Sequence, residues 1–229
     1  VRPKFRETLS CWYRWLTRSV DFKFIEGAAV IPRSSLSDSQ RAKLHQKLAG
    51  PAERVVSYFG FANSNKGVEH LFQIADPVRD RLVLICDLQE SNTYHSQILA
   101  ACNSDAWVGR VTVTGFLSAQ EVSEILDASD AVILPFSNGG GDWNSTILAA
   151  RQQGSLVVTT STVLKGYDAA TNTFYCLPGD VAAMAKALAQ FVGRKSKSLK
   201  MTRDIWSEIA EKHVLVYEQV LMTNCEISQ

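Results

Sequence analysis

The chain has 229 residues, the length of one large domain or of one domain with an appendage. Hydrophobic residues make up 46% and charged residues 21% of it, so the composition is that of a globular protein that can bury a core without disulfides or metals. The formal net charge is +1, which argues against a polyanionic partner such as nucleic acid.

Residues 4–20 open the predicted elements with apolar and aromatic side chains at helical spacing, interleaved with arginines. Such a basic amphipathic helix either packs on the rest of its protein or docks on a membrane surface or a partner. We favour packing and keep peripheral membrane contact as the alternative.

From residue 55 onward, short β-branched apolar runs alternate with amphipathic helical segments. The predicted strands are 55–59, 81–86, 111–114, 131–134, 156–159 and 174–176. The predicted helices are 67–74, 95–102, 119–128, 146–153 and 181–192. Continuous apolar strands separated by helices are typical of a parallel sheet that is buried on both faces. The predicted fold class is therefore α/β, with a doubly wound, mostly parallel sheet.

The chain ends with a polar, basic link at 194–200 and an amphipathic helix predicted over 203–221. We therefore expect three parts. Residues 1–25 form the basic helical segment, and residues 26–200 form the α/β domain. Residues 201–229 hold a helix that packs on that domain or on a partner domain.

Cysteine and histidine usage predicts no bound metal. The five cysteines are scattered, odd in number and without a CxxC pair, and the four histidines lack metal-ligand spacing. No apolar run reaches the roughly 18–20 residues that span a bilayer, and no signal peptide opens the chain. We expect a cytoplasmic protein with reduced cysteines.

Ligands of a doubly wound sheet bind outside the carboxyl ends of the strands, where the strand order reverses. The loop after the first predicted strand contains Gly60, Phe61 and Lys66. Backbone N–H groups at a helix start, together with a lysine, can hold a phosphate. The loop matches neither GxGxxG nor the Walker pattern, so on spacing alone a solvated loop is the simpler explanation of Lys66.

The loop after the strand at 131–134 has successive glycines followed by helix-capping residues. The residues concerned are Gly139, Gly140, Gly141, Asn144, Ser145 and Thr146. Glycines let the backbone approach a ligand closely, and the cap residues supply oxygens and free amides. We favour an anion cradle here over a flexible turn.

A third loop follows the strand at 111–114 and contains Gly115 and Phe116. Its backbone could border a planar base. The alternative is a plain strand-to-helix turn in which Ser118 is the N-cap.

Eight segments of the chain, taken in order, carry a resemblance to a known family. They are YFGF (58–61) with KG (66–67), LVLI (82–85), VTGFLS (113–118), DAVILPF (130–136), STILAA (145–150), GSLVVTT (154–160), LPGD (177–180), and Trp206 with Tyr217. Together they resemble the C-terminal half of family 4 glycosyltransferases over about residues 55–217. The resemblance implies a Rossmann-like, donor-binding domain that is one half of a GT-B fold.

For function, the resemblance implies a hexosyltransferase whose C-terminal domain binds a nucleotide-diphosphate sugar of the UDP or GDP type. It implies transfer with retention of configuration and no cofactor or metal. Lys66 falls on the lysine that contacts the donor diphosphate, and Gly115 and Phe116 fall beside the base. The segments 139–141 and 144–146 fall where sugar and phosphates lie. Fixed positive groups suit this chemistry, because the leaving diphosphate gains charge in the transition state.

The sequence departs from the family at three positions. Phe61 stands where many relatives have arginine, and Gly141 and Ala149 stand where they have two glutamates. Asp142, next to the first of these positions, is the candidate substitute. The alternative function is therefore a catalytically inactive GT-B-like module that binds a nucleotide sugar or acts as a scaffold. An unrelated doubly wound protein is the third possibility.

In whole enzymes of this family, the acceptor and usually a catalytic group come from an N-terminal domain of comparable size. A chain of 229 residues is too short to hold it. We expect either that Val1 begins a piece of a longer protein or that the chain is an isolated or degenerate half. We expect no transfer activity from this chain in isolation.

Overall fold

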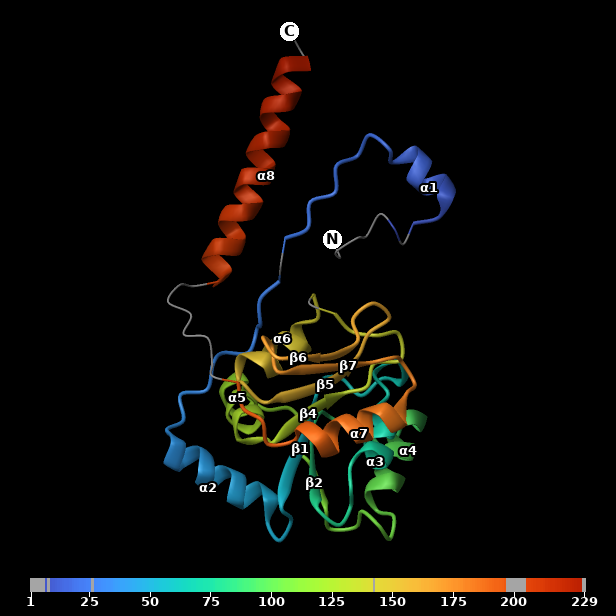
Figure 1. The fold of residues 1–229 in the computed structure, drawn as a ribbon, viewed down its shortest axis with the longest axis vertical. Helices are drawn as coiled ribbons and strands as arrows, with labels where there is room; N and C mark the ends of the chain where they lie inside the picture. The colour runs from blue at the N-terminus through green and yellow to red at the C-terminus, as the bar shows by residue number, and fades with distance from the viewer. Residues whose placement is uncertain (1–6, 8, 26, 142, 197–204, 228–229) are drawn as a thin grey trace. The chain divides into compact units, whose positions relative to one another are not determined.

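A computed structural model describes residues 7, 9–25, 27–141, 143–196 and 205–227. They form two compact units, Ala29–Leu199 on one hand and Val1–Ala28 with Lys200–Gln229 on the other. The sheet and the helices that cover it belong to the first unit (Figure 1).

A seven-stranded sheet with the order β3-β2-β1-β4-β5-β7-β6 forms the centre of the larger unit. Its strands are β1 (Arg54–Phe59), β2 (Asp80–Ile85), β3 (Val111–Val113), β4 (Ala131–Leu134), β5 (Leu156–Thr160), β6 (Gly166–Asp168) and β7 (Thr173–Cys176). Every pair is parallel except β6 with β7. The predicted α/β fold class with a mostly parallel sheet is confirmed.

Helices cover both faces of this sheet (Figure 1). One face carries α2 (Asp38–Ala49), α5 (Ala119–Ala128) and α6 (Ser145–Gln152), of which α5 contacts both others. The other face carries α3 (Leu71–Ile74), α4 (Thr93–Cys102) and α7 (Val181–Phe191), with short 3₁₀ turns η2 (Ser64–Lys66) and η3 (Val68–His70). This arrangement makes the sheet doubly wound.

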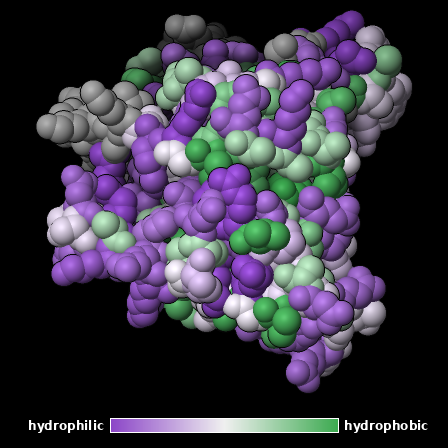
Figure 2. Space-filling view, turned by 60° about the horizontal axis from the view of Figure 1, so that its bottom comes forward, coloured by the Kyte–Doolittle hydropathy of each residue, from purple (hydrophilic) through white to green (hydrophobic). Residues whose placement is uncertain are grey.

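The central strands supply the core. Every residue of β4 and β5 is buried, and α6 and α7 cover β5 from opposite faces. Buried polar residues in this core are hydrogen-bonded, as Ser57 and Ser129 are through their hydroxyls at 2.6 Å. On the face shown in Figure 2, hydrophilic residues surround the hydrophobic side chains that remain at the surface.

The helix predicted over 67–74 is broken into η3 and the single turn α3. Gly67, at the start of this stretch, has a left-handed φ of 65° and ends η2. A Cβ on Gly67 would lie 2.3 Å from the carbonyl oxygen of Pro135, so this stretch is pressed against the turn after β4. The contact with Pro135 determines the conformation of this stretch, and helical periodicity in the sequence cannot predict such a contact.

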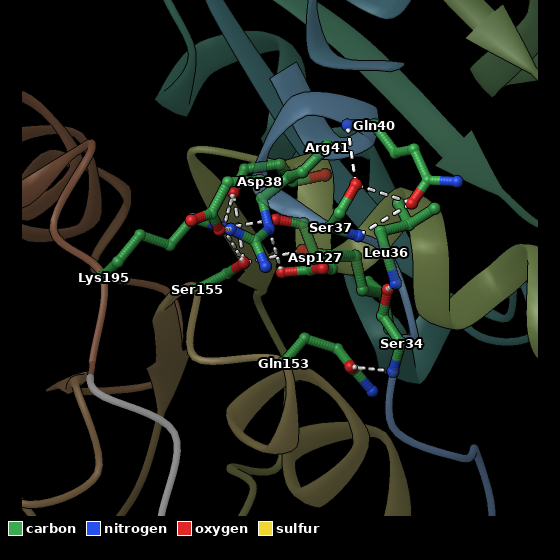
Figure 3. A network of polar contacts seen from close by, with 12 residues as sticks. Ser34, Leu36, Ser37, Asp38, Gln40, Arg41, Asp127, Gln153, Ser155 and Lys195 are labelled. Atoms are coloured by element: carbon green, nitrogen blue, oxygen red, sulfur yellow. Dashed lines mark hydrogen bonds and ion pairs between the residues drawn. The ribbon is translucent and has the colours of Figure 1, made fainter. Parts of the chain in front are cut away.

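A polar network closes the amino-terminal side of the sheet (Figure 3). Arg41 of α2 donates to Asp127 of α5 at 2.8 Å. The Lys195 ammonium, beyond α7, donates to the Ser155 hydroxyl at 2.7 Å and to the carbonyl oxygen of Ser129 at 2.8 Å. These hydrogen bonds join α2, near the start of the larger unit, and Lys195, near its end, to the residues that precede β4 and β5.

The smaller unit contains α1 (Cys11–Leu16) and α8 (Ile205–Ile227). Only six residues of the helix predicted over 4–20 are helical in the described part, and residues 1–6 and 8 lie outside it. Trp12 and Trp15 of α1 are exposed, and the Arg18 guanidinium lies 5.5 Å from the centre of the Trp15 ring. Among the described helices, none combines the length and apolar character needed to cross a membrane.

Candidate functional site

The strand order reverses beside β1. The chain runs from β1 to β2 and β3 on one side and then crosses to β4 and β5 on the other. The loops that leave β1 and β4 are therefore neighbours at the carboxyl ends of their strands, where doubly wound sheets bind ligands.

Direct contacts join these two loops. The Ser137 amide donates to the carbonyl oxygen of Asn65 at 3.0 Å, and the Ser137 hydroxyl donates to that of Ser64 at 3.2 Å. Gly67 packs on the carbonyl of Pro135. The two segments that the sequence analysis predicted as phosphate binders thus form one continuous structure.

The start of α6 adjoins the same structure. A Cβ on Gly60 would lie 3.7 Å from the Thr146 hydroxyl, so the end of β1 faces the first turn of α6. The Asn144 side chain caps this helix and accepts from the amides of Thr146 and Ile147 at 3.0 and 3.4 Å. Two of the amides that the sequence analysis left free for a ligand are therefore used by the cap, while Ser145 is exposed.

The Lys66 ammonium, in the loop after β1, contacts the ring of Phe136, which follows β4. It is 4.8 Å from the centre of the Phe136 ring, which is 4% exposed. No hydrogen bond or ion pair of this ammonium is found with any residue that the structure describes. Among the described residues, the contact found for this charge is therefore with the uncharged Phe136 ring.

The three glycines of the turn after β4 are required by packing. The atoms nearest to a Cβ built on them are Ser161 Cα at 3.3 Å for Gly139, Ile147 Cδ1 at 2.6 Å for Gly140 and Trp143 Cζ3 at 2.2 Å for Gly141. The space that a Cβ would fill is thus occupied by side chains at Gly140 and Gly141, and it is tight at Gly139. These glycines allow the turn to fold tightly, rather than leaving their Cβ side open to a ligand.

Side chains of β1 and α4 hydrogen-bond the carbonyls of the loop after β1. Tyr58 Oη donates to the carbonyl oxygen of Phe61 at 2.8 Å, and His95 Nε2 bonds that of Ala62 at 2.8 Å. His95 Nδ1 accepts from the Gln89 amide at 3.0 Å, which assigns the ring proton to Nε2. Burial raises the pKa of Tyr58, which keeps its hydroxyl a neutral donor.

Tyr94 holds the far end of the same loop. Its hydroxyl accepts from the Val68 amide at 3.1 Å and donates to the Glu69 carboxylate. Burial, and then the hydrogen bond to Glu69, raise the pKa of Tyr94. The sequence analysis missed Tyr94 and its neighbour His95, although their place at the start of the helix after the second strand was a usable signal.

The predicted site residues not yet placed are Gly115, Phe116, Asp142 and the side chain of Phe61. Gly115 and Phe116 follow β3, which β2 separates from β1. The ring of Phe116 is 76% exposed, and Gly115 has a left-handed φ of 69° with open space around a Cβ. Phe61 is also exposed, at 70%. Asp142, the candidate substitute carboxylate, lies outside the described residues.

A pocket of about 190 Å³ is found elsewhere in the larger unit. Its lining residues are Ala49, Pro51, Ala52, Arg81, Val108, Gly109 and Arg110. These residues lie at the starts of β1, β2 and β3, on the opposite edge from Lys66, so we do not assign the pocket to the candidate site. Within the described ranges, no group of three or more His, Cys, Asp or Glu is placed to hold a metal ion.

Comparison with protein families gives a match to the model described as "Glycosyl transferases group 1" over residues 53–194. The match runs from just before β1 to just after α7 and so contains the whole candidate site. No curated protein sequence matches the chain.

Solved structures share the fold. Sucrose-phosphate synthase from Thermosynechococcus elongatus matches with a TM-score of 0.70 and 18% identity, over 92% of this chain and 55% of that one. Anabaena HepE in complex with UDP-glucose matches at 0.59 and 22%, over 73% and 47%. The C-terminal domain of the group 1 glycosyl transferase LpcC from Francisella tularensis matches at 0.57 and 17%, over 72% and 87%. The chain thus spans about half the length of the first two proteins.

Proposed function

Because this chain belongs to the glycosyl transferases group 1, we propose that it binds the nucleotide-diphosphate sugar of a hexosyl transfer reaction between the loop after β1 and the turn after β4. The observation that carries the proposal is the position of Lys66. Its ammonium lies 4.8 Å from the centre of the Phe136 ring in the turn after β4, beside the strand-order reversal, and has no carboxylate partner among the described residues.

The chemistry of the donor explains why such an ammonium would be useful. When the bond from the sugar to the diphosphate breaks, negative charge grows on the diphosphate oxygens. A fixed cation stabilises this charge without reorganisation, so it contributes more to the transition state than to the ground state. The exposed first turn of α6 at Ser145 would add the positive end of a helix dipole.

Gly115 and Phe116 would border the base of the same ligand. Two strand spacings separate β3 from β1, or about 10 Å. That separation suits a nucleotide whose base lies over β3 while its diphosphate reaches Lys66. We infer a UDP-type donor in the first instance, since HepE is described with UDP-glucose, and GDP remains the second nucleotide to test.

The acceptor would come from a second domain. The chain spans about half of the sucrose-phosphate synthase and HepE chains, and an N-terminal partner domain would supply the acceptor and a catalytic group. Transfer with retention of configuration and a cytoplasmic location, with or without peripheral membrane contact, belong to the same proposal.

Binding of nucleotides to the Lys66→Ala variant tests this function. We expect UDP to bind about tenfold to hundredfold more weakly than to the unchanged chain, because a charged hydrogen bond of about 1.5–3 kcal/mol is lost. Uridine, which has no phosphate, should bind equally to both. Titration calorimetry with UDP, GDP, ADP and the matching nucleosides measures this difference.

The control is Lys43→Ala, which removes the same charge from an exposed position of α2. This variant should bind UDP as the unchanged chain does. Equal losses of UDP and uridine in Lys66→Ala would show that Lys66 does not contact phosphate. Failure of every nucleoside diphosphate to bind the unchanged chain would reject donor binding altogether.

A nucleotide-sugar-binding module without transfer activity is the second candidate. Its support comes from the two positions where relatives carry glutamates. Ala149 is fully buried, and Gly141 is buried with its Cβ space filled by the Trp143 ring. A protein that contains this chain and an acceptor domain, binds UDP-glucose and releases no UDP over many hours would support this candidate.

A further inference from the structure

Phe136, whose side chain carries no charge or hydrogen-bonding group, contacts the proposed phosphate-binding cation Lys66. Its ring centre is 4.8 Å from Lys66 Nζ, which is within the distance of a cation–π contact. The ring is 4% exposed, so it is fixed by packing. An ammonium on a flexible four-carbon stem therefore rests on a rigid surface.

Two features of the turn hold this ring in place. A Cβ at Gly140 would lie 2.7 Å from Phe136 Cδ2 and 2.6 Å from Ile147 Cδ1, so the ring occupies space that only glycine leaves open. The carbonyl of Phe136 accepts from the Thr160 hydroxyl at 2.6 Å, and the Thr160 backbone carbonyl accepts from the Gly140 amide at 2.7 Å. The sheet therefore sets the position of the ring.

We propose that Phe136 is a positioning residue for Lys66. Its ring holds the Lys66 ammonium toward the diphosphate of the donor without neutralising the charge. A carboxylate in the same place would also fix the lysine, but it would cancel the charge that a phosphate needs. The π face of a ring attracts the ammonium through its quadrupole and leaves the net charge at +1. This inference rests on the proposed function, because only a bound nucleotide diphosphate gives the Lys66 ammonium a phosphate to contact.

A double-mutant cycle with UDP tests the proposal. Phe136→Leu keeps an apolar side chain and removes the π face, so we expect UDP to bind roughly threefold to tenfold more weakly, with uridine unchanged. In the Lys66→Ala background, Phe136→Leu should have no further effect on UDP. Phe136→Tyr keeps the π face and should restore affinity to within about twofold of the unchanged chain.

A merely structural role of Phe136 would give a different result. UDP and uridine would then weaken together, and Phe136→Leu would weaken UDP equally with and without Lys66. Either result overturns the proposal. If the Leu variant does not fold, Phe136→Met takes its place in the cycle.

The contact itself can be measured without a ligand. Protons next to the Lys66 ammonium lie over an aromatic ring, so their NMR signals should be shifted upfield. The shift should disappear in Phe136→Leu and persist in Phe136→Tyr. The upfield-shifted signal should be absent from the spectrum of Lys66→Ala, which assigns it to Lys66.

The two measurements separate the inference from the proposed function. A normal lysine signal in a chain that binds UDP through Lys66 would overturn the inference alone. A ring-shifted lysine in a chain that binds no nucleoside diphosphate would refute the proposed function, and with it the role of Phe136 in binding.

Discussion

Gly67 sets how closely the loop after β1 approaches the turn after β4. Its φ of 65° disfavours any other residue, and a Cβ would lie 2.3 Å from the backbone oxygen of Pro135. We expect Gly67→Ala to lower the free energy of unfolding by about 1–2 kcal/mol for the backbone conformation, and by a further 1–3 kcal/mol for the clash. Urea denaturation measures this loss.

Gly109 offers a matched control for the steric part of that loss. It has a similar φ of 72°, but a Cβ there would meet nothing within 4 Å. Gly109→Ala should therefore show only the conformational loss of about 1–2 kcal/mol. Equal losses in both variants would mean that the two loops separate easily, which would contradict a rigid binding crevice.

At the same scale, the sequence identified the cation but not its surroundings. Lys66 was singled out through the family resemblance, because on spacing alone a solvated loop was the simpler explanation, and its contact with phosphate stays a prediction. The Phe136 ring beside it could not be predicted, because the contact joins residues 70 positions apart in the chain. The packing of Gly140 and Gly141 could not be predicted either, since only the fold shows which atoms lie beside them, and their contact with a ligand stays a prediction.

Among the elements, α2 depends on a local signal that the sequence analysis did not use. Ser37 caps the helix and Gln40 completes the capping box. We expect Ser37→Ala to lower the free energy of unfolding by about 1 kcal/mol, because amides at the helix start lose their acceptor. Ser37→Asp should retain stability, since aspartate is an equally good cap. An unchanged urea midpoint in Ser37→Ala would contradict this role.

Elements were predictable where their own residues decide the structure. The helix predicted over 119–128 has the observed bounds, because Ser118 caps it and its buried face is strictly periodic. The central strands were found from their apolar runs. The three-residue edge strand β6 was missed, because only its pairing with β7 makes it a strand.

For the whole molecule, the alternation of strands and helices was enough to predict a doubly wound sheet, but it does not give the strand order. The position of β1 between β2 and β4 is what brings Lys66 to the turn after β4. From the sequence alone, only the family resemblance predicted that Lys66 and the turn after β4 lie together, since no local pattern indicates which strands are neighbours.

The division into two units leads to the last prediction, that residues 29–199 fold and bind nucleotide without the rest of the chain. Among the residues that the structure describes, the buried hydrophobic side chains lie in this unit, apart from Ala28 and Ile209. All contacts of the Lys66 loop described above are also internal to it.

We expect the shortened chain to unfold cooperatively, with a midpoint within about 4 °C of that of the full chain, the shift that 1 kcal/mol produces in a domain of this size. UDP at a hundredfold excess over its Kd should stabilise both chains by about 2.7 kcal/mol. Thermal unfolding followed by circular dichroism, with and without UDP, measures both quantities. A shortened chain that folds but loses a UDP effect seen in the full chain would mean that residues outside 29–199 contribute to the nucleotide site. In that case, the crevice between the loops after β1 and β4 would be only part of the site.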